Sequence, residues 1–394
     1  MRFEFATATR ILFGPGTIRE LPALAASFGG HTLLVTSQID PATTVVDHLT
    51  RLGWDLVKEL REKGVSSTLI SFQGEPTVEA VRTACGVARE AKADLVLGIG
   101  GGSALDAAKA IACLLVNEGD PLDYLEVIGK GKPVGRRSAP CVAIPTTAGT
   151  GSEVTSNAVL ASPEHKIKVS LRSPLMLPQL ALVDPQLTCG LPPALTASTG
   201  MDALTQVIEP YVSIKSTPIT DAICLEGIHR GARSLPVAYR EGDNEAARQD
   251  MAMTSLFGGM ALANAKLGAV HGFAATLGGM FDAPHGAICA RLLPIVMDVN
   301  VRALQERDPG NPALGRYATV AQILTGGPSS SVGDGVGWLE NLSRELRIPS
   351  LGAYGLRATD FADVVDKSAV ASSMKGNPIR LTANELTEIL ERAL

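Results

Sequence analysis

Two segments of the chain hold the side chains best suited to bind a metal ion. In "STGMDALTQVIEPY", Asp202 and Gln206 are four residues apart, so a helix would place both on one face. His271 and His285 follow in "LGAVHGFAATLGGMFDAPHGA", a stretch with almost no charge. A carboxylate with two imidazoles is typical of an Fe(II) or Zn(II) site whose open coordination position takes a substrate oxygen. The structural alternative is that the aspartate only stabilises the N-terminus of a helix and that the two histidines are hydrogen-bonded core or capping residues.

A glycine-rich turn could bind phosphate. "DLVLGIGGGSALDAAK" predicts a strand over 94–99, a tight turn at the three glycines of 100–102 and a helix from Ser103. Unobstructed backbone N–H groups and the positive end of a helix suit a phosphate or pyrophosphate. The spacing matches neither GxGxxG nor GxxxxGK[ST], so a turn that simply requires glycine is the alternative.

A threonine-rich loop follows the next predicted strand, "APCVAIP". In "IPTTAGTGSE", Thr146, Thr147 and Thr150 offer hydroxyl donors, while Gly149 and Gly151 let the backbone approach a ligand closely. Two such loops at the ends of parallel strands would form a ligand crevice. A connection held only by local side-chain to backbone bonds is the alternative.

The elements that must position these residues change in character near residue 190. Before it, β-branched runs such as 31–37 and 67–72 alternate with helical stretches, one of them capped by Thr77, which predicts βαβ units and a mainly parallel sheet. After it, the sequence predicts helices at 200–213, 217–236, 244–264, 268–280 and 285–306, and an exposed loop at 325–337. We therefore expect an α/β domain over 1–190 and an all-helical domain over 191–394, with the active site where they meet.

Composition argues against several classes of function. The 394 residues suffice for two domains, and 45% of them are hydrophobic. A formal charge of -5 provides no cationic surface for nucleic acid or anionic lipid. We expect neither a membrane span nor an export signal, because no long apolar run or basic leader is present. Six cysteines without CxxC pairs predict reduced thiols in a cytoplasmic protein.

Four motifs together, "GGGSALDAAKA", "PTTAGTGSEVT", "GMDALTQVIE" and the "HG" and "APHG" pair, resemble the iron-containing (group III) alcohol dehydrogenase family over most of the chain. The resemblance implies a dehydroquinate synthase-like architecture, a homodimer or higher homo-oligomer, and reduction of small aldehydes or ketones, or oxidation of alcohols, with NAD(H) or NADP(H). It implies a divalent ion, with Fe(II) favoured over Zn(II), at Asp202, Gln206, His271 and His285, of which the aspartate and the two histidines would be catalytic. The implied cofactor contacts are Ser37, Gly100, Gly101, Gly102, Ser103, Asp106, Thr146, Thr147, Thr150, Asn157 and Lys168.

The chain departs from the family pattern at three positions. Gln206 replaces a common histidine, and an amide oxygen is a weaker ligand for Fe(II) than imidazole. Ala275 stands where many members have a histidine that relays protons. Ser37 replaces an acidic residue that bonds the ribose 2′-hydroxyl, so NADP(H) is at least as well accommodated as NAD(H).

Three other functions remain compatible with parts of the sequence. A metal-independent reductase similar to maleylacetate reductases is favoured by Gln206 and opposed by the intact Asp202, His271 and His285. A dehydroquinate synthase-like lyase would need basic residues that the helical half lacks near its histidines. A non-catalytic nucleotide sensor would bind nucleotide tightly without turnover.

Overall fold

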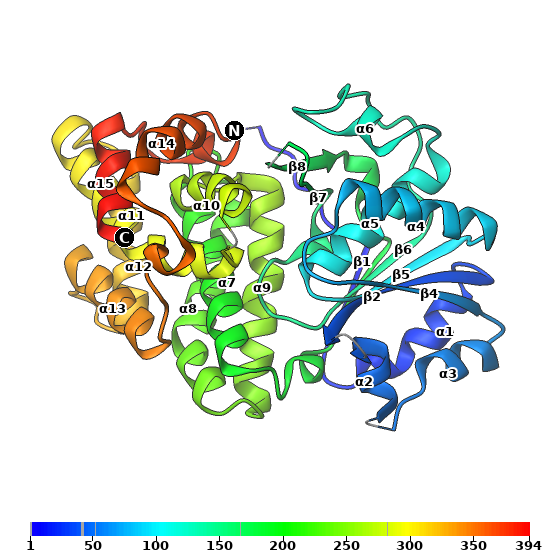
Figure 1. Cartoon of the computed structure of the whole chain (residues 1–394). Coiled ribbons are helices and arrows are strands. Elements are labelled where there is room, and N and C mark those ends of the chain that lie inside the picture. The colour runs from blue at the N-terminus through cyan, green and yellow to red at the C-terminus, as the bar shows by residue number, and fades with distance from the viewer. Residues whose placement is uncertain (1, 41–42, 52, 166, 282) are drawn as a thin grey trace. The chain divides into compact units, whose positions relative to one another are not determined.

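The computed structural model describes residues 2–40, 43–51, 53–165, 167–281 and 283–394. It divides into two compact units (Figure 1). The first comprises residues 1–5, 148–150 and 189–394, and the second comprises 6–147 and 151–188. We call them the helical unit and the α/β unit.

A seven-stranded sheet forms the centre of the α/β unit among the residues that the structure describes. The strand order is β1-β9-β6-β5-β2-β3, with β4 also paired to β2. All pairs are parallel except β2 with β3, which confirms the mainly parallel sheet predicted from the alternating pattern. The strands are β1 Arg10–Phe13, β2 His31–Asp40, β3 Thr43–Thr44, β4 Ser66–Phe72, β5 Leu95–Gly100, β6 Cys141–Pro145 and β9 Leu180–Val183, with a separate antiparallel pair, β7 Asn157–Ser162 and β8 Ile167–Arg172.

Helices cover both faces of this sheet because its strands bury side chains on both sides. Leu33 and Val35 of β2 belong to one apolar core, together with side chains of α4 and α5. Leu34, between them, belongs to the core on the opposite face with α1 and α3. The helices of the unit are α1 Leu21–Ala26, α2 Val45–Arg51, α3 Leu56–Glu62, α4 Val78–Glu90, α5 Gly102–Val116 and α6 Pro121–Tyr124. Thr77 caps α4 as predicted, accepting a hydrogen bond from the N–H of Ala80.

The helical unit contains no strand within its described residues. Its helices are α7 Pro193–Val212, α8 Pro218–Arg240, α9 Glu245–Ala265, α10 Ala269–Met280, α11 His285–Arg307, α12 Ala313–Thr325, α13 Val332–Glu345, α14 Phe361–Ala369 and α15 Ala383–Ala393. Helix α7 packs against α8, α9 and α11 and is buried over most of its length. The helices predicted between residues 200 and 306 are confirmed.

The predicted loop at 325–337 is wrong in its second half. Helix α13 begins at Val332, and Ser331 caps it by accepting a bond from the N–H of Asp334, whose carboxylate accepts one from Ser331 in return. The glycines that suggested a loop are tolerated inside the helix, and Gly335 allows close packing, since a Cβ atom there would lie 2.6 Å from that of Ala321. The capping pattern outweighed the poor helix propensity of glycine.

The close approach of α11 to α7 depends on Gly286. A Cβ atom at this position would lie 2.3 Å from the carbonyl oxygen of Ser198, which is a backbone atom that cannot rotate away. We expect Gly286→Ala to lower the free energy of unfolding by about 2 kcal/mol, in the range typical of overpacked interiors. Urea denaturation followed by circular dichroism measures this change.

Gly315 in α12 provides the matched control, because a Cβ atom there would meet nothing within 4 Å. Gly315→Ala is expected to raise stability by about 0.5 to 1 kcal/mol, since alanine favours a helix over glycine. Equal denaturation midpoints for the two variants would contradict the steric argument.

Candidate metal centre and cofactor loops

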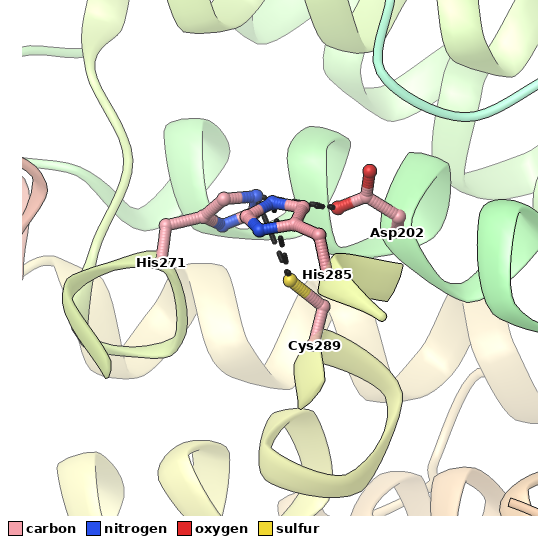
Figure 2. Close-up of side chains that lie close together, drawn as sticks. All are labelled: Asp202, His271, His285 and Cys289. Atoms are coloured by element: carbon pink, nitrogen blue, oxygen red, sulfur yellow. Dashed lines mark hydrogen bonds and ion pairs between the residues drawn. The ribbon is translucent and has the colours of Figure 1, made fainter. Parts of the chain in front are cut away.

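Three helices of the helical unit bring together the aspartate and the histidines predicted as metal ligands. Asp202 lies in the middle of α7, His271 in the first turn of α10, and His285 at the first position of α11. Figure 2 shows the three side chains pointing toward one another, with Cys289 beside them. The Nε2 atoms of His271 and His285 lie 3.3 Å and 3.7 Å from Oδ1 of Asp202.

Asp202 is a buried carboxylate whose Oδ1 faces both imidazoles but has no hydrogen-bond partner in the described part of the chain. The residue is 2% exposed, and its Oδ1 is among the buried polar atoms of the described residues that have no hydrogen-bond partner. An oxygen of this kind costs free energy unless a cation or a donor satisfies it. The atom that lacks a partner is the same one that both imidazole nitrogens face, which fits a cation among these groups.

Glu209 orients His271, a role that the sequence analysis did not predict. It lies two turns after Asp202 on α7, and its Oε2 is 2.7 Å from Nδ1 of His271. Its Oε1 accepts the N–H of Val270 at 2.7 Å and so also satisfies the start of α10. A carboxylate on Nδ1 directs the lone pair of Nε2 toward a metal ion. The sequence feature that could have predicted this role is the spacing of seven residues between Asp202 and Glu209, which places both carboxylates on one helix face.

Cys289 is the second residue of this centre that the sequence analysis did not predict. It is fully buried in α11, and its Sγ lies 3.8 Å from Nε2 of His271 and 3.8 Å from Nε2 of His285. One ligand atom from each of Asp202, His271, His285 and Cys289 lies within 4.8 Å of the others. The sequence feature that could have predicted its place in the cluster is its position one helical turn after His285, on the same helix face.

Gln206 lies one turn after Asp202 on α7 but makes a different contact. Its Nε2 donates a hydrogen bond of 3.0 Å to the carbonyl oxygen of Gly149, which belongs to the short segment 148–150 of the same unit. The amide is buried and therefore needs such a partner.

The charges of the centre are strongly coupled. Burial opposes the charged form of His285, but Cys289 and Asp202 outweigh it and raise the pKa of His285 to about 9. Burial likewise opposes the charge on His271, and the same two neighbours hold its pKa well above the usual value. Burial opposes ionisation of Asp202, yet the histidines lower its pKa. Protons and a metal ion would therefore compete for the same nitrogen atoms.

In the α/β unit, the two predicted loops follow adjacent strands at one edge of the sheet. Gly100 at the end of β5 is in register with Pro145 at the end of β6, and the N–H of Thr146 donates to the carbonyl of Gly100 at 2.9 Å. Ser37 near the end of β2 accepts a hydrogen bond of 3.2 Å from the N–H of Gly101. The structure thus brings together Ser37, Gly100, Gly101, Thr146 and Thr147, the last of which lies beside Gly101.

The first glycine of the turn is required by the fold itself. Gly100 has φ of +156°, and a Cβ atom there would lie 2.3 Å from Oγ of Ser37. Gly101, at the N-cap of α5, has φ of -73° and ψ of -178°, which any residue can adopt. A Cβ atom on Gly101 would only reach ordinary contact, 3.6 Å from Oγ1 of Thr147. The fold therefore explains Gly100 but leaves the glycine at 101 unexplained.

Asp106 holds the end of the threonine loop in place. Its Oδ1 accepts a bond of 2.5 Å from Oγ of Ser152, and its Oδ2 accepts the N–H of Val159 at 2.9 Å. The fully buried Lys109 lies 3.0 Å from this carboxylate and donates to the carbonyl of Ser152 and to Oγ1 of Thr155. Asp106 and Lys109 thus anchor the segment from α5.

The remaining predicted cofactor residues lie in several places. Gly102 and Ser103 form the first turn of α5. Asn157 begins β7, and Lys168 in β8 lies 3.0 Å from Glu75. Thr150 is grouped with the helical unit, whereas Thr146 and Thr147 are in the α/β unit.

Glu153, in the same segment as Ser152, provides a test of the buried charge there. It is 1% exposed, and burial raises its pKa from 4.5 to about 7. Because the unfolded chain gives up this proton at a lower pH than the folded protein, stability falls as pH rises from about 4.5 to 7 and stays lower above that. Glu153→Gln should raise the free energy of unfolding at pH 8 by about 1 to 3 kcal/mol and leave it unchanged near pH 4.5.

Denaturation of both proteins across this pH range measures the difference. The exposed Glu118 supplies the control, because a substitution at the surface, Glu118→Gln, should change the free energy of unfolding by less than about 0.5 kcal/mol. A stability gain of the same size at every pH would assign the effect of Glu153→Gln to packing rather than to the buried charge.

Comparison with known proteins agrees with both halves of the chain. Residues 8–185 match the model of the family described as iron-containing alcohol dehydrogenase, and residues 196–394 match the C-terminal domain of the Fe-containing alcohol dehydrogenase family. Alcohol dehydrogenase 4 of Saccharomyces cerevisiae (strain YJM789) is 35% identical over 383 residues, which is 97% of this chain and 96% of the yeast protein. The 1,3-propanediol dehydrogenase of Klebsiella pneumoniae is 33% identical over 404 residues, covering 99% and 98%.

Solved structures show the same fold. The crystal structure of a 1,3-propanediol oxidoreductase matches with a TM-score of 0.90 at 32% identity and covers 100% of both chains. Sulfoacetaldehyde reductase from Bifidobacterium kashiwanohense, solved in complex with NAD+, matches with a TM-score of 0.85 at 28% identity, covering 100% of this chain and 99% of that one. The sequence motifs, the fold and the relatives agree, and this chain belongs to the iron-containing alcohol dehydrogenase family of oxidoreductases.

Proposed function

We propose that the chain is a metal-dependent dehydrogenase or reductase that transfers hydride between NAD(P)(H) and a small alcohol, aldehyde or ketone. The observation that carries this proposal is the convergence of His271 and His285 on the buried Oδ1 of Asp202, which has no hydrogen-bond partner among the residues that the structure describes. Relatives over nearly the whole chain are named alcohol and propanediol dehydrogenases, which supports a substrate of this class.

The metal ion would be held by Asp202, His271 and His285. When bound there, a divalent ion supplies Lewis acidity, which stabilises negative charge on the oxygen of the alcohol or carbonyl. The other residues of the chain would orient these ligands and shield them from water. Glu209 fixes the tautomer and the ring plane of His271, and the burial of Asp202 keeps water from its carboxylate. Packing and hydrogen bonding would therefore hold the three ligands in place before the metal ion binds.

The cofactor would be held by the turn at the start of α5 and by the hydroxyls that follow β6. The first turn of α5 presents backbone N–H groups and the positive end of a helix of fifteen residues to a pyrophosphate. Ser37 carries no charge, so it would not repel a 2′-phosphate, and we propose that NADP(H) is accepted as well as NAD(H). The family neighbour solved with NAD+ supports a nicotinamide dinucleotide as the ligand.

Kinetics with the purified protein test this function. The protein, stripped of metal and reloaded with Fe(II) or Zn(II), should change nicotinamide absorbance with small alcohols, including 1,3-propanediol, or with the corresponding aldehydes. Both NAD(H) and NADP(H) need to be tried. No turnover over the whole panel, together with tight nucleotide binding, would favour a nucleotide sensor instead.

A metal-independent reductase of the same fold is the second candidate, and Gln206 favours it, because a neutral amide stands one turn after Asp202 where a histidine ligand is common in the family. Chelator treatment separates the two candidates. Activity that a chelator abolishes and that added metal restores supports metal dependence, whereas unaffected activity supports the alternative.

We also propose a homo-oligomer in the cytoplasm. The cysteines that the structure describes are all free thiols, and five of the six are buried, which suits a reducing compartment. No helix among the described residues is both long and apolar enough to span a bilayer. Sedimentation velocity measures the oligomeric state.

A further inference from the structure

We propose that the thiolate of Cys289 is a direct ligand of the metal ion, completing a set with Asp202, His271 and His285 in place of Gln206. This inference rests on the metal dependence proposed above. It concerns a residue that neither the sequence motifs nor the comparisons point to, and it gives the centre a sulfur ligand.

The distances among the four side chains fit a shared ion. Bond lengths typical of zinc place nitrogen and oxygen ligands of a tetrahedral ion about 3.3 Å apart, and nitrogen and sulfur ligands about 3.6 Å apart. The observed separations are 3.3 Å and 3.7 Å from Asp202 to the two imidazoles, and 3.8 Å from Sγ of Cys289 to each imidazole. One ligand atom of each side chain thus lies within 4.8 Å of the others, close enough to share one ion, and Figure 2 shows the four side chains close together.

The backbone arrangement explains why sulfur reaches this point. His285 and Cys289 are one helical turn apart on α11, so both side chains leave the same face of the helix. The start of α11 is held close to α7 by Gly286, which leaves no room for a Cβ atom next to Ser198. The close packing of these helices thus places Cys289 beside the carboxylate of Asp202.

Cys289 differs from the other cysteines in what it faces. Buried cysteines usually behave as small apolar side chains. Cys85, for example, is buried among apolar side chains of the α/β core, and burial raises its pKa to about 11. Cys289 instead faces Nε2 of His271 and Nε2 of His285, and both of these nitrogen atoms also face Oδ1 of Asp202. The thiol of Cys289 is therefore surrounded by a carboxylate and two imidazoles, which are typical metal ligands.

Gln206 offers only a weak ligand atom. Its Nε2 donates to the carbonyl of Gly149, so the only atom it could offer to a metal ion is its neutral Oε1. A thiolate is also a softer and stronger ligand than an amide oxygen, and it favours Zn(II) over the harder divalent ions. We expect the centre to prefer Zn(II) to a greater extent than one with only oxygen and nitrogen ligands.

Cobalt substitution of the full-length protein tests the inference without using turnover. Co(II) added to the metal-free protein should produce an intense thiolate-to-cobalt charge-transfer absorption in the near ultraviolet, with one equivalent bound per chain. Cys289→Ser should lose this absorption and bind Zn(II) at least about tenfold more weakly in competition with a chelator, since the loss of a partner outside the ligand shell already costs that much. Cys289→Ala should behave in the same way, and circular dichroism establishes that the variants are folded.

Two further variants provide matched controls. Cys189→Ser removes a thiol of the same unit that lies outside the cluster, and Gln206→Leu removes the amide. Both should keep the charge-transfer absorption. The inference is overturned if wild-type protein binds Co(II) without this absorption, if Cys289→Ser retains it, or if no Co(II) binds. Because the readout is spectroscopic, a failure to find any alcohol or carbonyl substrate would refute the proposed reaction and leave this ligand assignment standing.

Discussion

Asp202→Asn should lower kcat/KM by about a thousandfold, since the Lewis acidity of a bound metal ion contributes several kcal/mol and each 1.36 kcal/mol is a factor of ten. The substitution keeps the size of the side chain but removes its negative charge. It therefore takes away a negatively charged ligand of the proposed centre, the carboxylate that both imidazoles face. We also expect the protein to lose its metal during dialysis. Metal analysis and steady-state kinetics on the reloaded enzyme measure the two effects.

Asp221 offers a matched control for this experiment. It belongs to the first turn of α8 in the same unit, and its carboxylate is paired with Arg316 rather than with the histidines. Asp221→Asn should lose some stability but keep its metal content, with kcat/KM changed by less than about threefold. The proposed metal centre would be contradicted if Asp202→Asn retained full metal content and turnover, or if both variants lost metal equally.

Gly101→Ala should weaken the binding of the nicotinamide nucleotide by about a hundredfold, because its methyl group would occupy the space through which a pyrophosphate approaches the backbone. The fold tolerates this methyl group. The φ angle of Gly101 is open to any residue, and the new Cβ atom would lie 3.6 Å from the nearest side-chain atom, Oγ1 of Thr147. We therefore expect an unchanged denaturation midpoint. Fluorescence titration with NADH and with NADPH measures the affinity.

Gly86 in α4 is the control for the added methyl group. It lies in the same unit, and a Cβ atom there would meet nothing within 4 Å. Gly86→Ala should bind nucleotide as the wild type does and be slightly more stable. If Gly101→Ala retained full affinity for both nucleotides, the turn before α5 would not be the phosphate site, and its glycines would be explained by the fold alone.

Residue patterns within single elements determined much of the fold. The alternation of short strands with helices predicted the parallel sheet, and the end of the β-branched runs near residue 190 predicted the change to helices. The glycine turn was found at the end of β5 because glycine marks such turns directly. The error at residues 332–337 arose because glycine was taken as a helix breaker where the cap at Ser331 and tertiary packing decide.

The same patterns identified Asp202, His271 and His285, since carboxylate and imidazole are scarce in apolar segments and are typical ligands. They did not identify Glu209 or Cys289. A glutamate near the end of a helix and a cysteine in an apolar stretch have ordinary structural explanations that need no partner. Only the contact of each residue with His271 distinguishes it from that background.

The sequence by itself therefore determined which chemical groups are available and which secondary structure element holds each of them, because side-chain type and helical or strand periodicity are local properties. The tertiary structure alone decided which groups share a site. Asp202 lies on α7, far before His271 on α10 and Cys289 on α11 in the sequence, and their convergence depends on the packing of these three helices. It also decided that Gln206 is bonded to Gly149, since a side chain's partner is set by what packs against it rather than by its neighbours in the chain.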